Sequence, residues 1–268
     1  MNRPEWIKTG KRWLVECDGL TAFMNAGPRA VSHNDSESGS VGFTGTPSYA
    51  AAVALLKTGW PAGAERARAL SASLAGSLAA ADSCERPAPV WDVSGDDADV
   101  SRYLEGEPEN MVAWVPEMVP AAGRVVRLLL GGRVAFHVNE EQMKAAAVMV
   151  AAAADALESR GVRVEVVVAY AMMWKTTHLE IRHRLKAAEE ALDLPRVVAG
   201  MHPSAFRRVC FRWMETHADL PGTYGEGGKV TVAEGDVLLD INRIGVIKPA
   251  DRPAWLREQA EAVLGIPA

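Results

Sequence analysis

Residues 125–169 contain the segment that most constrains the fold. The uninterrupted apolar run of residues 125–130, closed by a glycine pair, predicts a strand buried on both faces. An alanine-rich helix is expected to follow, from an N-cap at Asn139 to a terminating Gly161. A second strand is expected over residues 162–169. This order predicts two parallel strands joined by a right-handed crossover, which places the chain in the α/β class.

Further periodic segments extend this pattern. Residues 179–186 alternate apolar and charged side chains, which predicts an edge strand with one charged face, and residues 236–241 are typical of another buried strand. Helices are expected over residues 46–58, 64–80, 203–214 and 253–264. We therefore predict a Rossmann-like, three-layer αβα fold. Its sheet would be mostly parallel with an antiparallel edge strand, and an irregular, α-rich N-terminal region would precede it.

Charge divides the chain near residue 120. Residues 1–120 carry 10 basic and 16 acidic side chains, whereas residues 121–268 carry 19 and 18. We predict an acidic, loop-rich region over 1–120, packed on an α/β domain over 121–268. No apolar run has the length of a membrane helix, so we expect a cytoplasmic protein that does not interact with membranes. The three cysteines form no CxxC pair, so neither a disulfide framework nor a zinc cluster is predicted.

The order of elements over residues 121–268 resembles that of a von Willebrand factor A-like domain: a parallel strand–helix–strand unit, a strand running back, then helices, a strand and a terminal helix. Members of that class usually coordinate Mg²⁺ through an Asp-x-Ser-x-Ser motif after the first strand. Here the turn over residues 131–135 reads Gly-Gly-Arg-Val-Ala and has no oxygen ligand in its side chains. The resemblance therefore implies this fold without its usual metal site.

Several short segments also resemble a family of uncharacterised proteins of tailed bacteriophages and prophages. They are Phe43–Thr46 with Gly59-Trp60, Asp92–Gly95 running to Tyr103–Glu109, and His202-Pro203 with Phe206–Arg208. That family has no established chemistry. The resemblance implies a phage or prophage origin and a location in the bacterial host cytoplasm or in the virion.

The acidic segment, residues 82–109, is the first candidate for a functional site. It holds nine acidic side chains against two arginines. Clustered carboxylates bind hard cations because several oxygens replace the lost hydration water. The candidate ligands are Asp92, Asp96, Asp97 and Asp99. A solvated acidic loop, a surface that faces a partner, a structural metal site and a catalytic role all stay open.

The basic segment, residues 175–212, is the second candidate. It holds eight basic side chains against four acidic ones. We expect a binding surface made of Arg182, Arg184, Arg207, Arg208 and His202. Such a surface could pair with the acidic segment or bind nucleic acid weakly, in a salt-sensitive manner. Alternating charge on an edge strand also prevents pairing between sheets.

No motif predicts a catalytic residue or a cofactor. The glycine-rich residues 225–231 lack the Ser or Thr that must follow the lysine of a P-loop. Our hypothesis is a non-catalytic protein-binding or assembly module whose partner is a phage or host protein or a second copy of the chain. The alternative is a metal-dependent enzyme or a nucleic-acid-processing protein that uses residues 82–109.

Overall fold

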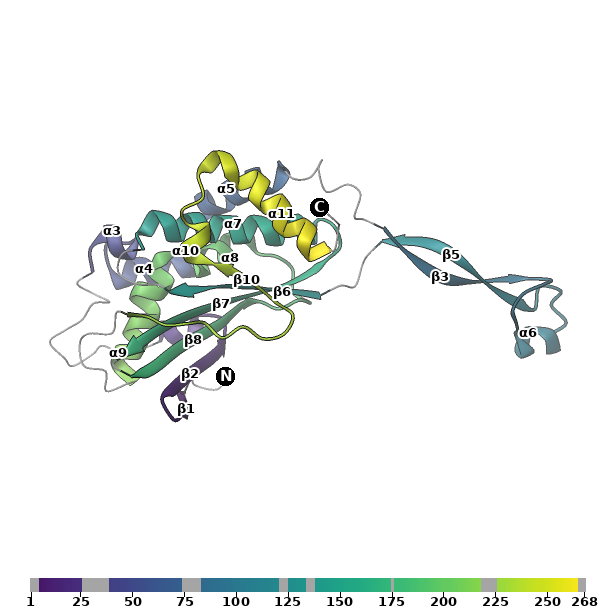
Figure 1. Cartoon of the computed structure of the whole chain (residues 1–268), viewed down its shortest axis with the longest axis horizontal. Helices are drawn as coiled ribbons and strands as arrows, with labels where there is room; N and C mark the ends of the chain where they lie inside the picture. The colour runs from purple at the N-terminus through teal and green to yellow at the C-terminus, as the bar shows by residue number, and fades with distance from the viewer. Residues whose placement is uncertain are drawn as a thin grey trace.

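The computed structural model describes residues 5–25, 39–73, 83–120, 125–133, 138–174, 176–217 and 226–264. These residues form a body built on one large sheet, and a narrow arm, residues 83–120, that extends far from it (Figure 1). Body and arm differ in architecture, so each is described in turn.

The sheet of the body is mixed, with the strand order β1-β2-β8-β7-β6-β10. β6 is parallel to β7 and β10, and β2 is parallel to β8, whereas β7 and β8 are antiparallel. A short β9 pairs with β7. The strands are β1 (Ile7–Thr9), β2 (Arg12–Asp18), β6 (Val125–Arg133), β7 (Arg163–Trp174), β8 (Thr177–Lys186), β9 (Glu226–Gly227) and β10 (Asp236–Asp240).

Helices cover this sheet and supply much of the core. They are α1 (Thr21–Met24), α3 (Val41–Thr44), α4 (Tyr49–Thr58), α5 (Pro61–Ala72), α7 (Glu140–Glu158), α8 (Leu194–Gly200), the π-helix η2 (Ala205–Cys210), α9 (Phe211–His217), α10 (Ile241–Ile244), the 3₁₀-helix η3 (Pro249–Asp251) and α11 (Arg252–Leu264). The α/β class is confirmed. None of the helices within the described ranges is long and apolar enough to cross a bilayer.

Helix α7 is the expected crossover between the parallel strands β6 and β7. Its capping box forms as predicted, because the side chains of Asn139 and Gln142 each accept a hydrogen bond from the other's backbone N–H at 2.9 Å. Helix α7 is rich in alanine and is buried on several sides. Helices α5 and α11 pack above it, and the sheet lies below it (Figure 1).

Strand β8 is not the edge strand that its alternation predicts, because β2 and β1 continue the sheet beyond it. The side chains between the charged ones face the helices: Leu185 touches Gly200 of α8, and the ring of His183 lies beside Phe23. Glu180, Arg182 and Arg184 lie on the opposite face, whereas Lys186, at the end of the strand, pairs with Glu158 of α7. Alternation here reflects burial on one face only, which an interior strand of a mixed sheet can also show. The sequence predicts helices on both faces, whereas those described gather on one (Figure 1).

The arm is a twisted antiparallel hairpin of β3 (Ser83–Asp92) and β5 (Met111–Pro120), with β4 (Asp97–Ala98) and α6 (Val100–Leu104) at its far end. The sequence predicts loops over most of this acidic segment, so the ordered hairpin corrects that expectation. The division at residue 120 stays a prediction, although β1 and β2 complete the sheet that the C-terminal residues build.

Candidate interaction surfaces

The tip of the arm exposes large apolar side chains. Val100, Tyr103 and Leu104 of α6 are 64%, 67% and 78% exposed. Residues spaced three and four apart lie on one face of a helix, so the three side chains form a single apolar face. Val93, in the turn that follows β3, is also exposed. Isolated exposed apolar residues are ordinary, but a cluster such as this one is typical of an interaction site.

Polar contacts on its other side fix α6 to the hairpin. The Asp99 carboxylate accepts hydrogen bonds from the backbone N–H groups of Ser101 and Arg102, and from the Trp91 indole at 3.1 Å. The bond from the Arg102 backbone is the main cause that lowers the pKa of Asp99. The Arg102 side chain lies over the Trp91 ring and donates to the Glu109 carbonyl. The apolar face of α6 is therefore held outward.

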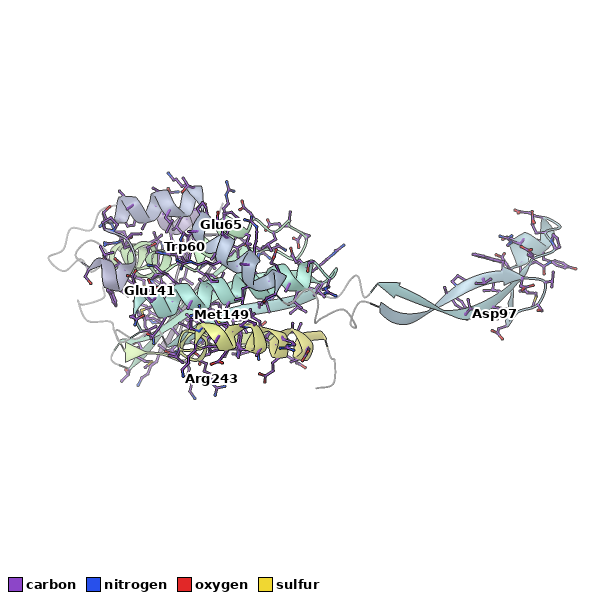
Figure 2. The ribbon with its side chains drawn as sticks, turned by 90° about the horizontal axis from the view of Figure 1, so that it is seen from above. Trp60, Glu65, Asp97, Glu141, Met149 and Arg243 are labelled. Carbon is purple, nitrogen blue, oxygen red and sulfur yellow. The ribbon has the colours of Figure 1, made fainter. Side chains whose placement is uncertain are left out.

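The predicted metal ligands Asp92, Asp96, Asp97 and Asp99 all lie between the end of β3 and the start of α6, and Figure 2 shows Asp97 in this outer part of the arm. Asp92 accepts a hydrogen bond from the Val93 backbone, and Asp99 caps α6. Within the described ranges, no three His, Cys, Asp or Glu side chains are grouped as metal ligands would be. Asp92 and Asp99 therefore act locally, as turn and cap residues, and all four aspartates add to the negative charge of the tip.

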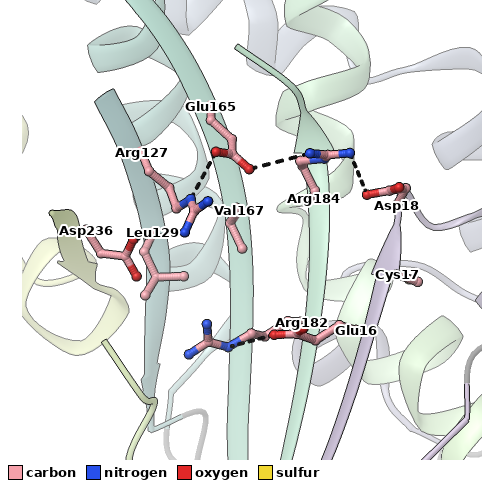
Figure 3. A pocket seen from close by; sticks show the side chains of 10 residues that line it. All are labelled: Glu16, Cys17, Asp18, Arg127, Leu129, Glu165, Val167, Arg182, Arg184 and Asp236. Atoms are coloured by element: carbon pink, nitrogen blue, oxygen red, sulfur yellow. Dashed lines mark hydrogen bonds and ion pairs between the residues drawn. The ribbon is translucent and has the colours of Figure 1, made fainter. Parts of the chain in front are cut away.

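Arg182 and Arg184, two of the predicted binding residues, lie on the face of the sheet opposite the helices. They line a shallow cleft of about 350 Å³ that is filled with ion pairs (Figure 3). Arg184 bonds Asp18 at 2.9 Å and lies 3.8 Å from Glu165, which also bonds Arg127 at 2.9 Å. Basic and acidic side chains alternate across the cleft, so it is not a basic patch.

Buried Glu180 organises the neighbouring part of this face. Its carboxylate pairs with Arg182 at 2.7 Å and with Arg12 at 3.0 Å. It also accepts a hydrogen bond from the Thr231 hydroxyl at 3.0 Å. Residues 228–231 are thereby held across the sheet, where the His178 ring also contacts the Lys229 carbonyl.

Burial raises the pKa of Cys17, which lines the cleft, to about 12, so its thiol stays protonated.

Arg207 and Arg208, predicted to lie on a binding surface, are instead fully buried in η2. Arg207 donates to the Phe43 carbonyl at 2.7 Å and lies over the Phe43 ring. Arg208 donates to the carbonyls of Thr46 and Gly39, at 2.6 and 2.9 Å. The guanidinium groups thus fix the segment before α4 to the body. A guanidinium has five N–H donors, so carbonyl oxygens can satisfy it inside a protein.

His202, the fifth predicted binding residue, is also buried. Its Nδ1 lies 2.8 Å from the Ser204 hydroxyl, and its ring meets the edge of Trp60. Burial, assisted by the charge of Lys144, lowers the pKa of His202 to about 3, so the ring is neutral near pH 7. A Cβ at Gly45 would lie 2.6 Å from this ring, so the close fit requires a glycine there. The role of His202 in the structure is packing.

The turn after β6 is described only in part, because residues 134–137 lie outside the described ranges. Gly132 has a φ of 155°, and a Cβ there would lie 2.8 Å from the Asp240 carboxylate. That carboxylate accepts hydrogen bonds from the backbone and side chain of Asn242. Asp240 therefore caps α10 beside the glycine pair.

Sequence reasoning missed the apolar face of α6. The signal was present, because Asp99 is a good N-cap and residues 100, 103 and 104 have helical spacing. The dense carboxylates around these residues indicated a cation site instead. The apolar residues, and not the acidic ones, are the unusual feature of the tip.

Comparison with known proteins identifies a family for the chain. No curated protein and no solved structure is significantly similar to the chain. A family described as a domain of unknown function, DUF7192, matches residues 4–242, which include the arm and most of the body. The chain therefore belongs to the DUF7192 family.

Proposed function

We propose that the chain is a non-catalytic protein-binding or assembly module and that the tip of the arm is its contact element. The observation that carries this proposal is the exposed apolar face of Val100, Tyr103 and Leu104 on an ordered helix far from the body. Exposed apolar area is favourable to bury, by about 25 cal/mol per Å². This free energy would stabilise a complex in which a partner covers the face, whereas in the isolated chain the face stays in contact with water.

The strands of the arm support contact through the tip over contact through a sheet edge. β3 contains Pro87 and Pro89, and β5 contains Pro116 and Pro120. Proline has no N–H to donate, so it disfavours the addition of another strand. The hairpin is thus suited to a spacer that presents its tip.

A phage or prophage origin and a von Willebrand factor A-like C-terminal region are part of this proposal. The order β8-β7-β6-β10, with β8 running back along β7, supports the second point. Both oxygens of Asp99 already accept hydrogen bonds within the tip, which favours contact through the tip over the metal-dependent alternative.

Site-specific photo-crosslinking in the producing cells tests the proposal. A photoreactive amino acid replaces exposed Val93 at the tip or, as a matched control, exposed Val246 on the body. We expect a discrete protein adduct from position 93 that is lost when Tyr103→Ser and Leu104→Ser are added. Equal adducts from both positions, or an adduct unaffected by the two serines, would contradict the proposal.

A further inference from the structure

The body has a groove whose chemistry matches the tip of the arm. It lies between α5, the first half of α7 and the start of α11, and its volume is about 590 Å³. Leu70, Val148, Pro249 and Pro253 give it apolar walls, Arg66 and Arg252 give it positive charge, and Lys144 and Glu141 pair with each other. An occupant with apolar and acidic side chains would complement these walls.

The arm has the opposite character. Residues 83–120 hold nine acidic and two basic side chains, a net charge of −7, whereas the rest of the chain has 25 acidic and 27 basic ones, a net charge of +2. The arm is thus more negative than the whole protein, whose net charge is −5. Charge of opposite sign steers two surfaces together and selects their register.

The charged cleft on the sheet is a poorer match for the tip. It is lined by four carboxylates, from Glu16, Asp18, Glu165 and Asp236, against three arginines. Those charges already pair with one another, so an acidic tip would meet net negative charge. In the groove, ion pairs to Glu140 and Glu141 neutralise Lys144, while Arg66 and Arg252 flank the apolar walls. The groove therefore suits the tip better.

The arm of the same chain points away from this groove. Asp97 at the tip and Glu141 at the groove lie toward opposite ends of the molecule (Figure 2). Each strand of the hairpin has ten residues, which span about 33 Å at 3.3 Å per residue. The arm is therefore long enough to reach a neighbouring molecule, and it points away from the groove of its own chain.

We propose that the tip of the arm docks into the groove between α5, α7 and α11 of a second copy of the chain. The apolar face of α6 packs against Leu70 and Val148, and the acidic residues around it approach Arg66 and Arg252. This inference rests on the proposed function and names its partner. The contact is small, so we expect a reversible association of micromolar strength.

Exchange of charges in the purified full-length protein tests the docking. The tip variant carries Asp97→Lys and Glu105→Lys, and the groove variant carries Arg66→Glu and Arg252→Glu. Sedimentation velocity should show self-association of the wild type, weakened about tenfold in either variant. An equimolar mixture of the two variants should associate again, since Lys then meets Glu and Asp meets Arg. Asp18→Lys, in the charged cleft, is the matched control and should associate like the wild type.

Three results would overturn the inference: a wild type that stays monomeric, a groove variant that associates normally, or a mixture that associates no better than its components. The rescue by mixing cannot arise from misfolded variants. An adduct from position 93 to another protein, together with a monomeric wild type, would overturn the second copy as partner and leave the proposed function standing. Loss of the adduct as well would overturn both.

Discussion

The body and the arm reverse the usual places of charged and apolar residues. The body buries Arg207, Arg208, Glu180 and Lys186, whereas the arm exposes Tyr103 and other large apolar side chains. Burial is tolerated in the body because the three cations donate to backbone carbonyls, while Glu180 accepts from two arginines and the Thr231 hydroxyl. Lys186, for example, contacts Glu158 at 2.5 Å and donates to the Val164 carbonyl at 2.8 Å. Satisfied hydrogen bonds, and not polarity alone, decide what an interior accepts.

The arm shows the converse. Its local polar contacts are made, as in the cap of α6 by Asp99, yet its apolar side chains find no cover within the hairpin. Changes in the body should therefore alter stability, and changes at the tip should alter association. The predictions below test this difference, beginning with the largest expected effect.

Replacement of a buried arginine should strongly destabilise the body. Arg208→Ala removes the guanidinium bonds to the carbonyls of Thr46 and Gly39 and opens a cavity, so we expect a loss of about 4 kcal/mol in the free energy of unfolding. Urea denaturation measures this loss. Arg184→Ala, at a half-exposed ion pair, is the control and should cost about 1 kcal/mol or less. Equal losses would show that burial does not distinguish the two.

The stability of the body should fall in mild acid. Burial lowers the pKa of His183 to about 4 and that of His202 to about 3, from an ordinary 6.5. Below pH 6.5 both histidines bind protons in the unfolded chain but not in the folded one. The stability that is fully present above pH 6.5 is therefore lost progressively as the pH falls toward the folded pKa values. Each histidine should lower the free energy of unfolding by about 1.4 kcal/mol per pH unit of acidification, or by about 3 kcal/mol for the pair.

Denaturation at pH 6.0 and pH 5.0 checks this dependence. His183→Asn should reduce the slope, even if it lowers stability at pH 7. The arm has no histidine, so its secondary structure should not respond over this range. A slope that His183→Asn leaves unchanged would contradict the assignment to the buried rings.

Removal of the carboxylate under residues 228–231 should have an intermediate effect. Glu180→Ala deprives Arg12, Arg182 and Thr231 of a shared acceptor, and we expect a loss of about 2 kcal/mol. Limited proteolysis should then cut sooner near residue 230. Glu16→Ala, on a half-exposed residue of the same face, is the control and should leave the cleavage rate unchanged. Similar rates in both variants would show that Glu180 does not hold the segment.

Local sequence signals predicted the strand–helix–strand unit well. The capping box at Asn139 and the apolar run into β6 both depend on neighbours in sequence, so periodicity finds them. The position of β8 could not be found in this way. Its alternating pattern fits an edge strand or an interior one, and the parallel pairing with β2 joins residues about 165 positions apart.

The interaction surfaces illustrate the same limit. Arg207 and Arg208 look like a basic patch in sequence, because nothing local shows that the backbone carbonyls of residues 39–46 will surround them. The exposure of Leu104 was equally hidden, since a helix with apolar residues at this spacing is usually covered by its own chain. Fold class follows from local pattern, whereas exposure depends on tertiary contacts.

The smallest expected change in stability belongs to the tip, and it sharpens the comparison most. Leu104→Ser should change the free energy of unfolding by less than about 0.5 kcal/mol, because the side chain is 78% exposed and has little packing to lose. The same substitution should weaken self-association about tenfold, since it removes most of an apolar side chain from the docked face. Denaturation and sedimentation velocity on one preparation measure both quantities. Val246→Ser, on an exposed valine of the body, should alter neither. A Leu104→Ser protein that is clearly destabilised yet associates normally would mean that this residue supports the arm and makes no contact with a partner.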